Sequence, residues 1–312
     1  MQGCERGLLV TSTLHLFWDL FGALAGSGVA IYADVGIYPV VRWGVERAAA
    51  RGVPVRGFAH HDPESLRRRL KLDARSGWRP LVVTDGFCPY CGGPAPVVEY
   101  LECARDYGGI LILDDTQALG ILGHSPDADA PYGKGGGGVL RWSNVAGPDV
   151  LVGSSLAKSF GVPVAALSGG RALVEHFESE SETRVHSSPP SAAVIHAAEH
   201  ALAVNQTQGD ALRSSLAQLV GYFRRRLAET GIPVSGGLFP VQTIAPRLDV
   251  ATLHERLQRA GVRTVLSQGR NGRGRRLSFL LSARHQPSEI DYALDALARA
   301  LSGKTMKQRN WR

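Results

Sequence analysis

The chain has 312 residues, of which 44% are hydrophobic, and it carries a formal net charge of +7. This length is enough for one large α/β domain and a second, smaller domain. No apolar run approaches the roughly 20 residues that span a bilayer, and the start lacks the basic region and apolar core of a signal peptide, so a cytoplasmic protein is expected. The basic residues lack the motifs and aromatic interleaving of nucleic-acid modules, so anionic small molecules are the expected partners.

The first half of the sequence alternates between apolar strands and amphipathic helices. A short strand, a polar turn at 11–13 and a helix ending at 26–28 come first. Further strands are expected at 29–34, 53–59, 79–84 and 109–113, with helices at about 39–51, 60–70 and 95–107. Four such cycles predict a mostly parallel, doubly wound sheet whose ligand lies at the carboxyl ends of its strands. The sequence places Asp34, Asp85, Asp114 and Asp115 at these ends.

The second half predicts a smaller α+β unit. After a glycine-rich loop at 124–148, which lacks the P-loop arrangement, the expected elements are helices at 190–204 and 211–230, a strand at 241–245, a helix at 250–260, strands near 262–266 and 276–282, and a closing helix at 288–301. We therefore divide the chain into a large domain at 1–205 and a small domain at 206–312, with a long linking helix at about 206–230.

The chain has four cysteines, Cys4, Cys88, Cys91 and Cys103. They are too few for a disulfide scaffold. Cys88 and Cys91 form a CPYC pair, but one pair without a second pair or a nearby histidine is weak evidence for a zinc or redox site, so structural cysteines at a turn are expected. His60, His61 and Asp62 are adjacent and would point in different directions. They predict a turn, and no metal ion is expected.

The stretch DVLVGSSLAKSFG, residues 149–161, combines an apolar run, small polar residues and one lysine, Lys158. A lysine just past a buried strand is well placed to form a Schiff base. On this stretch alone, an ordinary surface lysine is an equal alternative. The start of the first helix, after the turn at 11–13, offers free backbone N–H groups and so a seat for a phosphate.

Six segments in chain order favour a Schiff-base role for Lys158 over that of a surface lysine. They are ADVGIYPVVRWG, FAHHD, VVTDGFCPYCGGPAPVVEYLECARDYG, GILILDDTQALGILG, DVLVGSSLAKSFG and RVHSSPPSAA. Each resembles a motif of the α-oxoamine synthase family, and together they cover most of residues 5–300. The resemblance implies the fold of type I pyridoxal 5'-phosphate (PLP) enzymes, with a mostly parallel sheet in a large domain and a smaller C-terminal α+β domain.

The resemblance assigns cofactor roles to matching residues. Lys158 would hold PLP as a Schiff base, and Asp114 would face the pyridine nitrogen and keep it protonated. Ser155 would help to hold the phosphate. The backbone of three further residues, Ser12, Thr13 and Leu14, would supply the other phosphate donors.

Two positions depart from the family. The histidine expected to stack on the ring is Tyr38, which can cover a ring face but does not relay a proton near neutral pH as imidazole does. The second histidine is Gln117, which can form hydrogen bonds but does not titrate. The glycine pair after the lysine segment is Val164 and Ala165, which would tighten the pocket. These changes bear on the reaction, so Tyr38 and Gln117 are candidate catalytic and cofactor-binding residues together with Lys158 and Asp114.

The resemblance also implies a homodimer with shared active sites. His186 and Ser187 fall where a neighbouring subunit contacts the phosphate. Arg263 matches the arginine that binds the substrate carboxylate, although a strand-edge arginine without a partner in the site is an alternative. The family's N-terminal arm has no counterpart in this sequence, so a partner supplies it, the pocket is more open, or the chain is a shortened form.

Three functions are compatible with these residues. The first is an α-oxoamine-synthase-like condensation, in which a PLP-bound amino acid attacks an acyl thioester of CoA or a carrier protein and loses CO₂. The basic loop at 270–276 would then meet the CoA or phosphopantetheine tail, although a solvated loop is the commoner explanation. The second is transamination on the same fold, for which an aromatic ring cover is normal. The third is a non-catalytic subunit that pairs with a complete relative.

Overall fold

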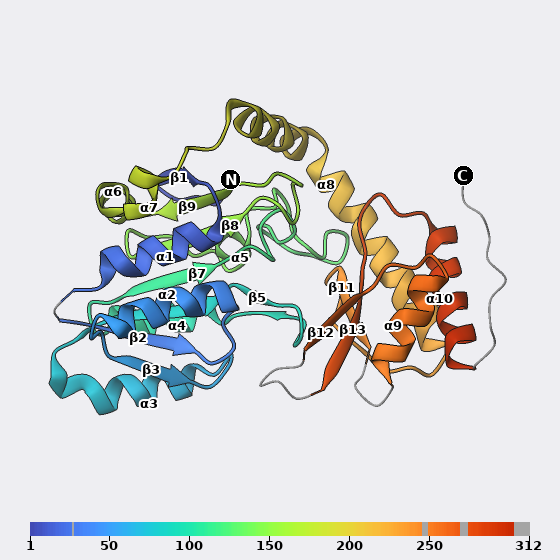
Figure 1. The fold of residues 1–312 in the computed structure, drawn as a ribbon, viewed down its shortest axis with the longest axis horizontal. Coiled ribbons are helices and arrows are strands. Elements are labelled where there is room, and N and C mark those ends of the chain that lie inside the picture. The colour runs from blue at the N-terminus through green and yellow to red at the C-terminus, as the bar shows by residue number, and fades with distance from the viewer. Residues whose placement is uncertain (27, 245–248, 269–273, 303–312) are drawn as a thin grey trace. The chain divides into compact units, whose positions relative to one another are not determined.

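The computed structural model describes residues 1–26, 28–244, 249–268 and 274–302 (Figure 1). The chain forms two compact units, one made of Met1–Cys88 and Pro94–Asp210, the other of Pro89–Gly93 and Ala211–Arg312. Two arginines of the basic loop at 270–276, Arg270 and Arg273, lie outside the described residues, as do residues 304–312. No helix in the described part of the chain is long and apolar enough to cross a membrane.

A seven-stranded sheet forms the centre of the first unit. Its order is β1-β9-β8-β7-β4-β2-β3, and the strands are β1 (Arg6–Val10), β2 (Val29–Asp34), β3 (Val55–Phe58), β4 (Arg79–Asp85), β7 (Ile110–Asp114), β8 (Val150–Ser155) and β9 (Ala165–Gly169). The five strands from β8 to β3 are mutually parallel, and β9 pairs antiparallel with both β8 and β1. The predicted mostly parallel α/β fold is confirmed.

The helices of the first unit follow its strands. They are α1 (Thr13–Leu24), α2 (Pro39–Ala50), α3 (Pro63–Asp73), η1 (Ala74–Ser76), α4 (Val97–Arg105), α5 (Val139–Trp142), α6 (Arg171–Glu180) and α7 (Glu182–His186), and a short strand pair, β5 (Phe87–Cys88) and β6 (Gly93–Pro94), follows β4. Asp62 caps α3, and its carboxylate accepts a hydrogen bond from the N–H of Ser65 at 2.9 Å, ahead of Pro63.

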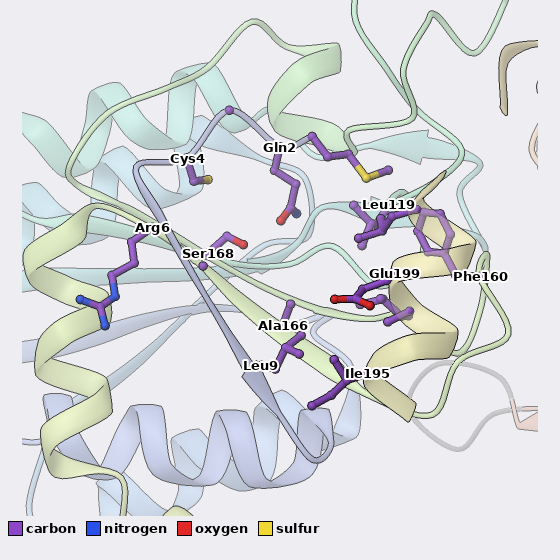
Figure 2. Close-up of a pocket in the computed structure, with 16 residues that line it drawn as sticks. Gln2, Cys4, Arg6, Leu9, Leu119, Phe160, Ala166, Ser168, Ile195 and Glu199 are labelled. Atoms are coloured by element: carbon purple, nitrogen blue, oxygen red, sulfur yellow. The ribbon is translucent and has the colours of Figure 1, made fainter. Parts of the chain in front are cut away.

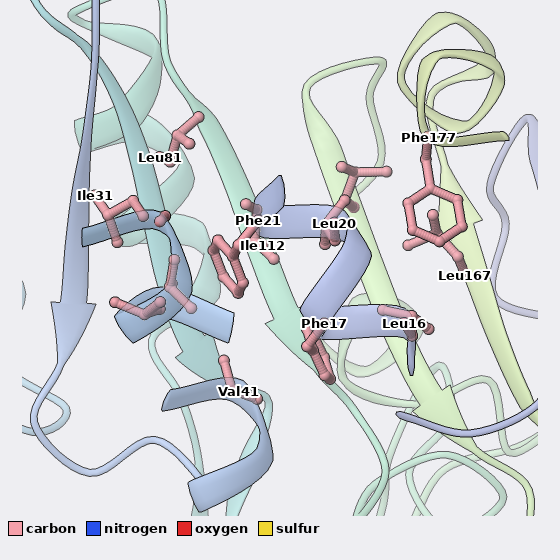
Figure 3. Close-up of a cluster of buried hydrophobic side chains, with 14 of the residues drawn as sticks. Leu16, Phe17, Leu20, Phe21, Ile31, Val41, Leu81, Ile112, Leu167 and Phe177 are labelled. Atoms are coloured by element: carbon pink, nitrogen blue, oxygen red, sulfur yellow. The ribbon is translucent and has the colours of Figure 1, made fainter. Parts of the chain in front are cut away.

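One apolar cluster fixes α1 and α2 against the sheet (Figure 3). Leu16, Phe17, Leu20 and Phe21 of α1 are at most 1% exposed and meet the strand residues that alternate along the sheet. Each such side chain contributes on the order of 1.5–3 kcal/mol. The helices approach closely at Gly44, where an added Cβ would lie 2.4 Å from the Phe17 carbonyl oxygen. This packing holds the start of α1 at the edge of the sheet.

The predicted pair of helices at 190–204 and 211–230 is wrong. A single helix, α8, runs over 37 residues from Ala192 to Ala228. The polar segment between the predicted helices contains one glycine and no proline, and a glycine costs a helix only about 1 kcal/mol, which cannot stop so long a helix. The predicted boundary at residue 205 and the division after Asp210 both fall inside α8.

The second unit contains a four-stranded antiparallel sheet in the order β10-β11-β13-β12, formed by β10 (Val234–Ser235), β11 (Val241–Ile244), β12 (Val265–Gln268) and β13 (Arg275–Leu280). Two helices accompany it, α9 (Val250–Arg259) and α10 (Pro287–Leu301). The α+β character of this part agrees with the sequence, while the strand predicted near 262–266 begins at Val265 because Val262 instead closes the end of α9 through its N–H.

Candidate functional site

The carboxyl ends of five strands meet at one edge of the large sheet. Asp85 of β4 is in register with Asp114 of β7, and Asp114 with Gly153 of β8. Val10 of β1 and Ser155 of β8 both pair with Ala165 of β9, so the start of α1 lies at the same edge. Residues from distant parts of the sequence therefore meet where ligands of such sheets bind.

Asp114 is the buried carboxylate of this edge. It is 7% exposed, and its Oδ1 accepts a hydrogen bond from the N–H of Thr116 at 3.0 Å. Burial raises the pKa of Asp114, and the Thr116 hydrogen bonds and the charge of Lys158 oppose that rise without cancelling it. A carboxylate in this state gains stability from any cation placed beside it.

Lys158 lies in the turn that follows β8, and its side chain is exposed. Hydrogen bonds fix this turn from both sides. The Ser155 N–H donates to the Thr116 hydroxyl at 3.0 Å, and the Ser155 hydroxyl accepts from the N–H of Ala157 at 3.2 Å. Thr116, which the sequence did not single out, thus links the Asp114 carboxylate to the lysine turn, and its place two residues after a strand-end aspartate was the available signal.

The start of α1 presents backbone N–H groups that could bind an anion. Ser12 caps the helix: its hydroxyl accepts from the His15 N–H at 3.4 Å, and its carbonyl from the Leu16 N–H at 3.0 Å. The N–H groups of Thr13 and Leu14 have no acceptor within the helix, and the first turn holds no acidic residue. This geometry suits a phosphate, as the sequence predicts for these three residues.

Tyr38 and Gln117 lie in segments that follow strand ends at this edge. Tyr38 is the N-cap of α2, is 54% exposed, and donates its backbone N–H to Asp85 Oδ1 at 3.1 Å. Gln117 is half-buried in the turn after β7. Burial and the neighbouring Asp114 raise the pKa of Asp85 well above its usual range. Asp85 is thus a second residue of the site that sequence reasoning noted only as a strand end.

Asp115 has a structural position although it follows Asp114 directly. It is fully buried, and its carboxylate accepts from the N–H of Val139 at 3.1 Å. Burial raises the pKa of Asp115 well above its usual range. An added Cβ at Gly138, whose φ is +82°, would lie 1.8 Å from its Oδ2, so glycine is required there. Asp115 fixes the glycine-rich loop, in which α5 replaces part of the predicted loop.

The remaining predicted residues belong to segments after β9. His186 ends α7 and is exposed, and Ser187 follows it half-buried. Asp19 of α1 fixes the start of α7, accepting from the Thr183 N–H at 3.0 Å. Arg263 belongs to the second unit, exposed between α9 and β12. The roles of His186, Ser187 and Arg263 stay predictions.

A cavity of about 340 Å³ lies beside the N-terminal segment and the first turns of α8 (Figure 2). Its lining includes Leu156 and Phe160, which flank the lysine, but neither Lys158 nor Asp114. The two central residues of the candidate site therefore do not line this cavity.

The residues at the edge fit PLP. The cofactor combines a ring nitrogen that can be cationic, an aldehyde and a phosphate. Asp114 lacks a full complement of positive partners, Lys158 supplies an exposed amine, and the start of α1 supplies unused N–H donors. Each group of the cofactor therefore has a counterpart on this chain.

Comparisons with known sequences agree with this fit. A family model described as aminotransferase class I and II matches residues 10–297. An 8-amino-7-oxononanoate synthase of Alkalilimnicola ehrlichii is 32% identical over 307 residues, which cover 96% of this chain and 74% of that protein. One from Sodalis glossinidius is 32% identical over 302 residues, which cover 96% of this chain and 73% of that protein.

Solved structures share the fold. A serine palmitoyltransferase from S. paucimobilis, with a bound PLP-myriocin aldimine, gives a TM-score of 0.81 at 17% identity, over 97% of this chain and 74% of that one. An 8-amino-7-oxononanoate synthase from Francisella tularensis gives 0.72 at 18% identity, over 96% of this chain and 83% of that one. The fold is that of type I PLP transferases, and with the family model and the relatives at 32% identity it leads to one conclusion: the chain belongs to the aminotransferase class I and II family and, within it, to the α-oxoamine synthases, which are PLP-dependent transferases.

Proposed function

We infer that the protein catalyses a decarboxylative condensation: an amino acid and an acyl thioester of CoA or a carrier protein combine to an α-amino ketone, CO₂ and free thiol. This function rests on one observation at the edge of the large sheet. Burial raises the pKa of the Asp114 carboxylate, and the positive charge of Lys158 partly opposes that rise. The relatives are named as synthases of 8-amino-7-oxononanoate, which supports an acyltransferase over a transaminase.

Asp114 and Lys158 would do most of the chemistry on the protein's side. Bound PLP supplies an electron sink that stabilises negative charge on the substrate carbon. Asp114 keeps the pyridine nitrogen protonated, which maintains that sink. Lys158 would hold the cofactor, and its amine would be placed to carry a proton to or from the reacting carbon of the substrate. Ser155 and the start of α1, at Ser12, Thr13 and Leu14, hold the phosphate.

Tyr38, Gln117 and Arg263 would orient the reactants. Tyr38 covers one face of the ring, at a place set by the hydrogen bond from its backbone to Asp85. Gln117 can donate to or accept from the ring hydroxyl. Arg263 receives the carboxylate of the amino acid, for which a guanidinium offers two parallel donors.

The active protein is proposed to be a homodimer, in which His186 and Ser187 reach the phosphate of the neighbouring site. Both follow a segment anchored to α1, and the adjacent Val185 is 78% exposed, which suits a covered interface. Mixing inactive Lys158→Ala and Ser187→Ala subunits is expected to restore activity, since a mixed dimer has one intact site. A mixture that stays inactive although mixed dimers form would contradict shared sites. The cytoplasmic location stays a prediction.

The function is tested in two steps with purified protein. Titration with PLP should produce an absorbance band near the visible edge, and Lys158→Ala should lose it, while Lys134→Ala, which alters an exposed lysine of the glycine-rich loop, should keep it. The protein is then incubated with amino acids and acyl-CoA. Release of CO₂ and free thiol is expected. Keto acid formed without a thioester would identify an aminotransferase instead, and the absence of both the band and turnover would indicate a non-catalytic subunit.

A further inference from the structure

Asp85 and Asp114 end neighbouring parallel strands of the large sheet, β4 and β7. The two residues are in register, and neighbouring strands lie about 4.8 Å apart, so both side chains leave the same face of the sheet side by side. The pairing continues past them, since the Gly86 N–H donates to the Asp114 carbonyl oxygen at 2.8 Å. An added Cβ at Gly86 would lie 2.5 Å from Oδ1 of Asp115, so glycine is required where the two strand ends approach. The fold therefore holds two carboxyl groups next to each other.

Main-chain N–H groups donate to both carboxyl groups. Oδ1 of Asp85 accepts from the Tyr38 N–H at 3.1 Å, and Oδ1 of Asp114 accepts from the Thr116 N–H at 3.0 Å. These donors orient the carboxyl groups, but they are neutral and do not cancel the repulsion between two negative charges that lie side by side. The pair is therefore expected to keep one proton at neutral pH, because two such carboxylates do not both ionise readily.

Unequal surroundings place this proton on Asp85. Burial and three neighbouring acidic groups raise the pKa of Asp85 well above its usual range, and these groups are Asp114, Asp34 and the Cys88 thiol. At Asp114 burial also raises the pKa, but the positive charge of Lys158 opposes the rise. Asp114 is thus the member of the pair that ionises first, which leaves the proton on Asp85.

His60, a cation at the same edge, is paired with Asp34. Its Nδ1 lies 2.8 Å from Oδ1 of Asp34. Burial lowers the pKa of His60, but hydrogen bonds to Asp34 and Cys88 raise it overall to about 9, so His60 is cationic at neutral pH. Its ring stacks on that of His61, with centroids 3.8 Å apart, so the expectation that these two histidines point in different directions is wrong. The charge of His60 is therefore matched by Asp34.

We propose that Asp85 holds a proton beside the Asp114 carboxylate and donates it during turnover. The donation rests on the proposed function, whereas the protonation of Asp85 does not. The condensation takes up one proton, because the amino acid loses its carboxylate as neutral CO₂ and the sulfur of the thioester leaves as a neutral thiol. The O–H bond of Asp85 would break as the proton passes to the reacting substrate, and the resulting carboxylate would regain a proton from solvent.

Asp85 suits this task better than its neighbours. Tyrosine and glutamine, which occupy positions 38 and 117, do not carry protons near neutral pH as imidazole does. Asp114 must stay charged to hold a cation. Asp115 is fully buried, whereas Asp85 is half-buried and can exchange its proton with solvent. A carboxyl group with a raised pKa is an effective acid, because it keeps its proton near the working pH and still releases it.

Infrared spectroscopy of the purified full chain without cofactor tests the protonation of Asp85. The difference spectrum between the parent and Asp85→Asn at pH 7 should show the loss of the C=O stretch of a carboxylic acid. Asp149→Asn is the control and should lose carboxylate bands instead, because a hydrogen bond from Arg105 lowers the pKa of Asp149. Loss of carboxylate bands in Asp85→Asn would overturn the proposal.

The coupling between the two carboxyl groups gives a second readout. Asp114→Asn removes a neighbouring negative charge, so it should lower the pH at which the acid band of Asp85 disappears, by about one unit or more. The double variant Asp85→Asn/Asp114→Asn should lack the band, which assigns it to Asp85. Asp149→Asn should leave the midpoint unchanged. A midpoint that does not move in Asp114→Asn would mean that the two groups do not share a proton.

Turnover tests the donation. The parent rate should fall as pH rises through the pKa of Asp85, because only the acid form donates. Asp85→Asn should keep the PLP absorbance band, lose this alkaline limb and turn over at least about 10²-fold more slowly. Asp85→Glu restores a carboxyl group and should recover part of the rate, which a merely structural role would not predict. An Asp85→Asn enzyme with the parent rate and pH profile would overturn the donation. A parent that releases neither CO₂ nor thiol would refute the proposed function, and the infrared result would still decide the protonation.

Discussion

Two aspartates end strands of the same sheet, both are buried, and their environments are opposite. Burial alone would raise the pKa of Asp34, but hydrogen bonds from His60, Gly36 and His61 outweigh it and lower that pKa. Asp114 is 7% exposed and has Thr116 as its hydrogen-bond donor, and its pKa stays raised by burial. The same position in a strand therefore gives a carboxylate with a lowered pKa at Asp34 and one with a raised pKa at Asp114.

This difference separates a structural role for Asp34 from a cofactor-binding role for Asp114. The Asp34 carboxylate already accepts hydrogen bonds from its own chain, so it orients the residues around it and is not expected to bind a ligand. Asp114 lies beside Lys158 and is short of positive partners, so a cationic ring nitrogen would stabilise it and be stabilised in return. A functional carboxylate at such an edge is thus recognised by a pKa that its own chain leaves raised.

The largest effect is expected from Asp114→Asn. The amide keeps the shape but cannot hold a proton on the ring nitrogen, and breaking a buried pair of this kind costs about 3–5 kcal/mol, so turnover should fall by about 10²-fold to several 10³-fold. Steady-state rates with saturating PLP measure this. Asp149→Asn, which alters an aspartate paired with Arg105 on the surface, is the control and should stay near the parent rate. An Asp114→Asn enzyme with full turnover would remove Asp114 from the mechanism.

Asp34→Ala should instead reduce stability. It leaves the N–H groups of Gly36 and His61 and the ring of His60 without their acceptor, at a cost of about 2–4 kcal/mol in the free energy of unfolding. Urea unfolding of the apo protein measures the change. Asp73→Ala, whose carboxylate accepts from Tyr32 and Arg56 nearer the surface, should cost less. Equal losses in the free energy of unfolding would mean that the hydrogen bonds of Asp34 stabilise the protein no more than those of Asp73 do.

The sequence could predict the sheet and the positions of its strand-end aspartates, because buried parallel strands appear as apolar runs that stop at polar residues. It also located Lys158 and the start of α1. The strand pattern alone could not distinguish Asp34 from Asp114, which only the resemblance singled out, since the physical difference depends on how many donors converge on each carboxylate. Those donors, such as His60 and Thr116, come from turns whose geometry no periodicity encodes.

Two further features required three-dimensional information. The continuity of α8 through a polar segment depends on the long helix as a whole, where one glycine costs too little to end it. The meeting of His60 with Cys88 depends on the pairing order of β2, β3 and β4, which local patterns do not fix. Segment types were therefore predictable, whereas contacts between segments were not.

The apo protein should show the same contrast in its pH dependence. The folded state raises the pKa of Asp114 above the value of about 3.9 in the unfolded chain, so it binds the proton more tightly, and stability falls as pH rises from about 4 through the folded pKa. Asp114→Asn removes this loss and should make the apo protein more stable than the parent at pH 7. Urea unfolding at pH 5 and 8, with and without PLP, measures it.

Bound PLP should reverse the sign of the stability difference between the parent and Asp114→Asn. With PLP bound, the parent gains a cation beside Asp114 and should become more stable than Asp114→Asn. A variant that is less stable than the parent in the apo state would show that Asp114 is already satisfied by Lys158 and Thr116, and the contrast with Asp34 would then fail.

The smallest effect is expected at Tyr38. Its position depends on the backbone N–H that donates to Asp85, and every side chain at this position keeps that hydrogen bond. If Tyr38 only covers a ring face, Tyr38→Phe should change turnover less than about threefold, whereas Tyr38→Ala loses the stacking energy of about 0.5–1.5 kcal/mol and up to about tenfold in rate. A Tyr38→Phe enzyme as slow as Tyr38→Ala would mean that the hydroxyl takes part, because the two variants then share only its loss.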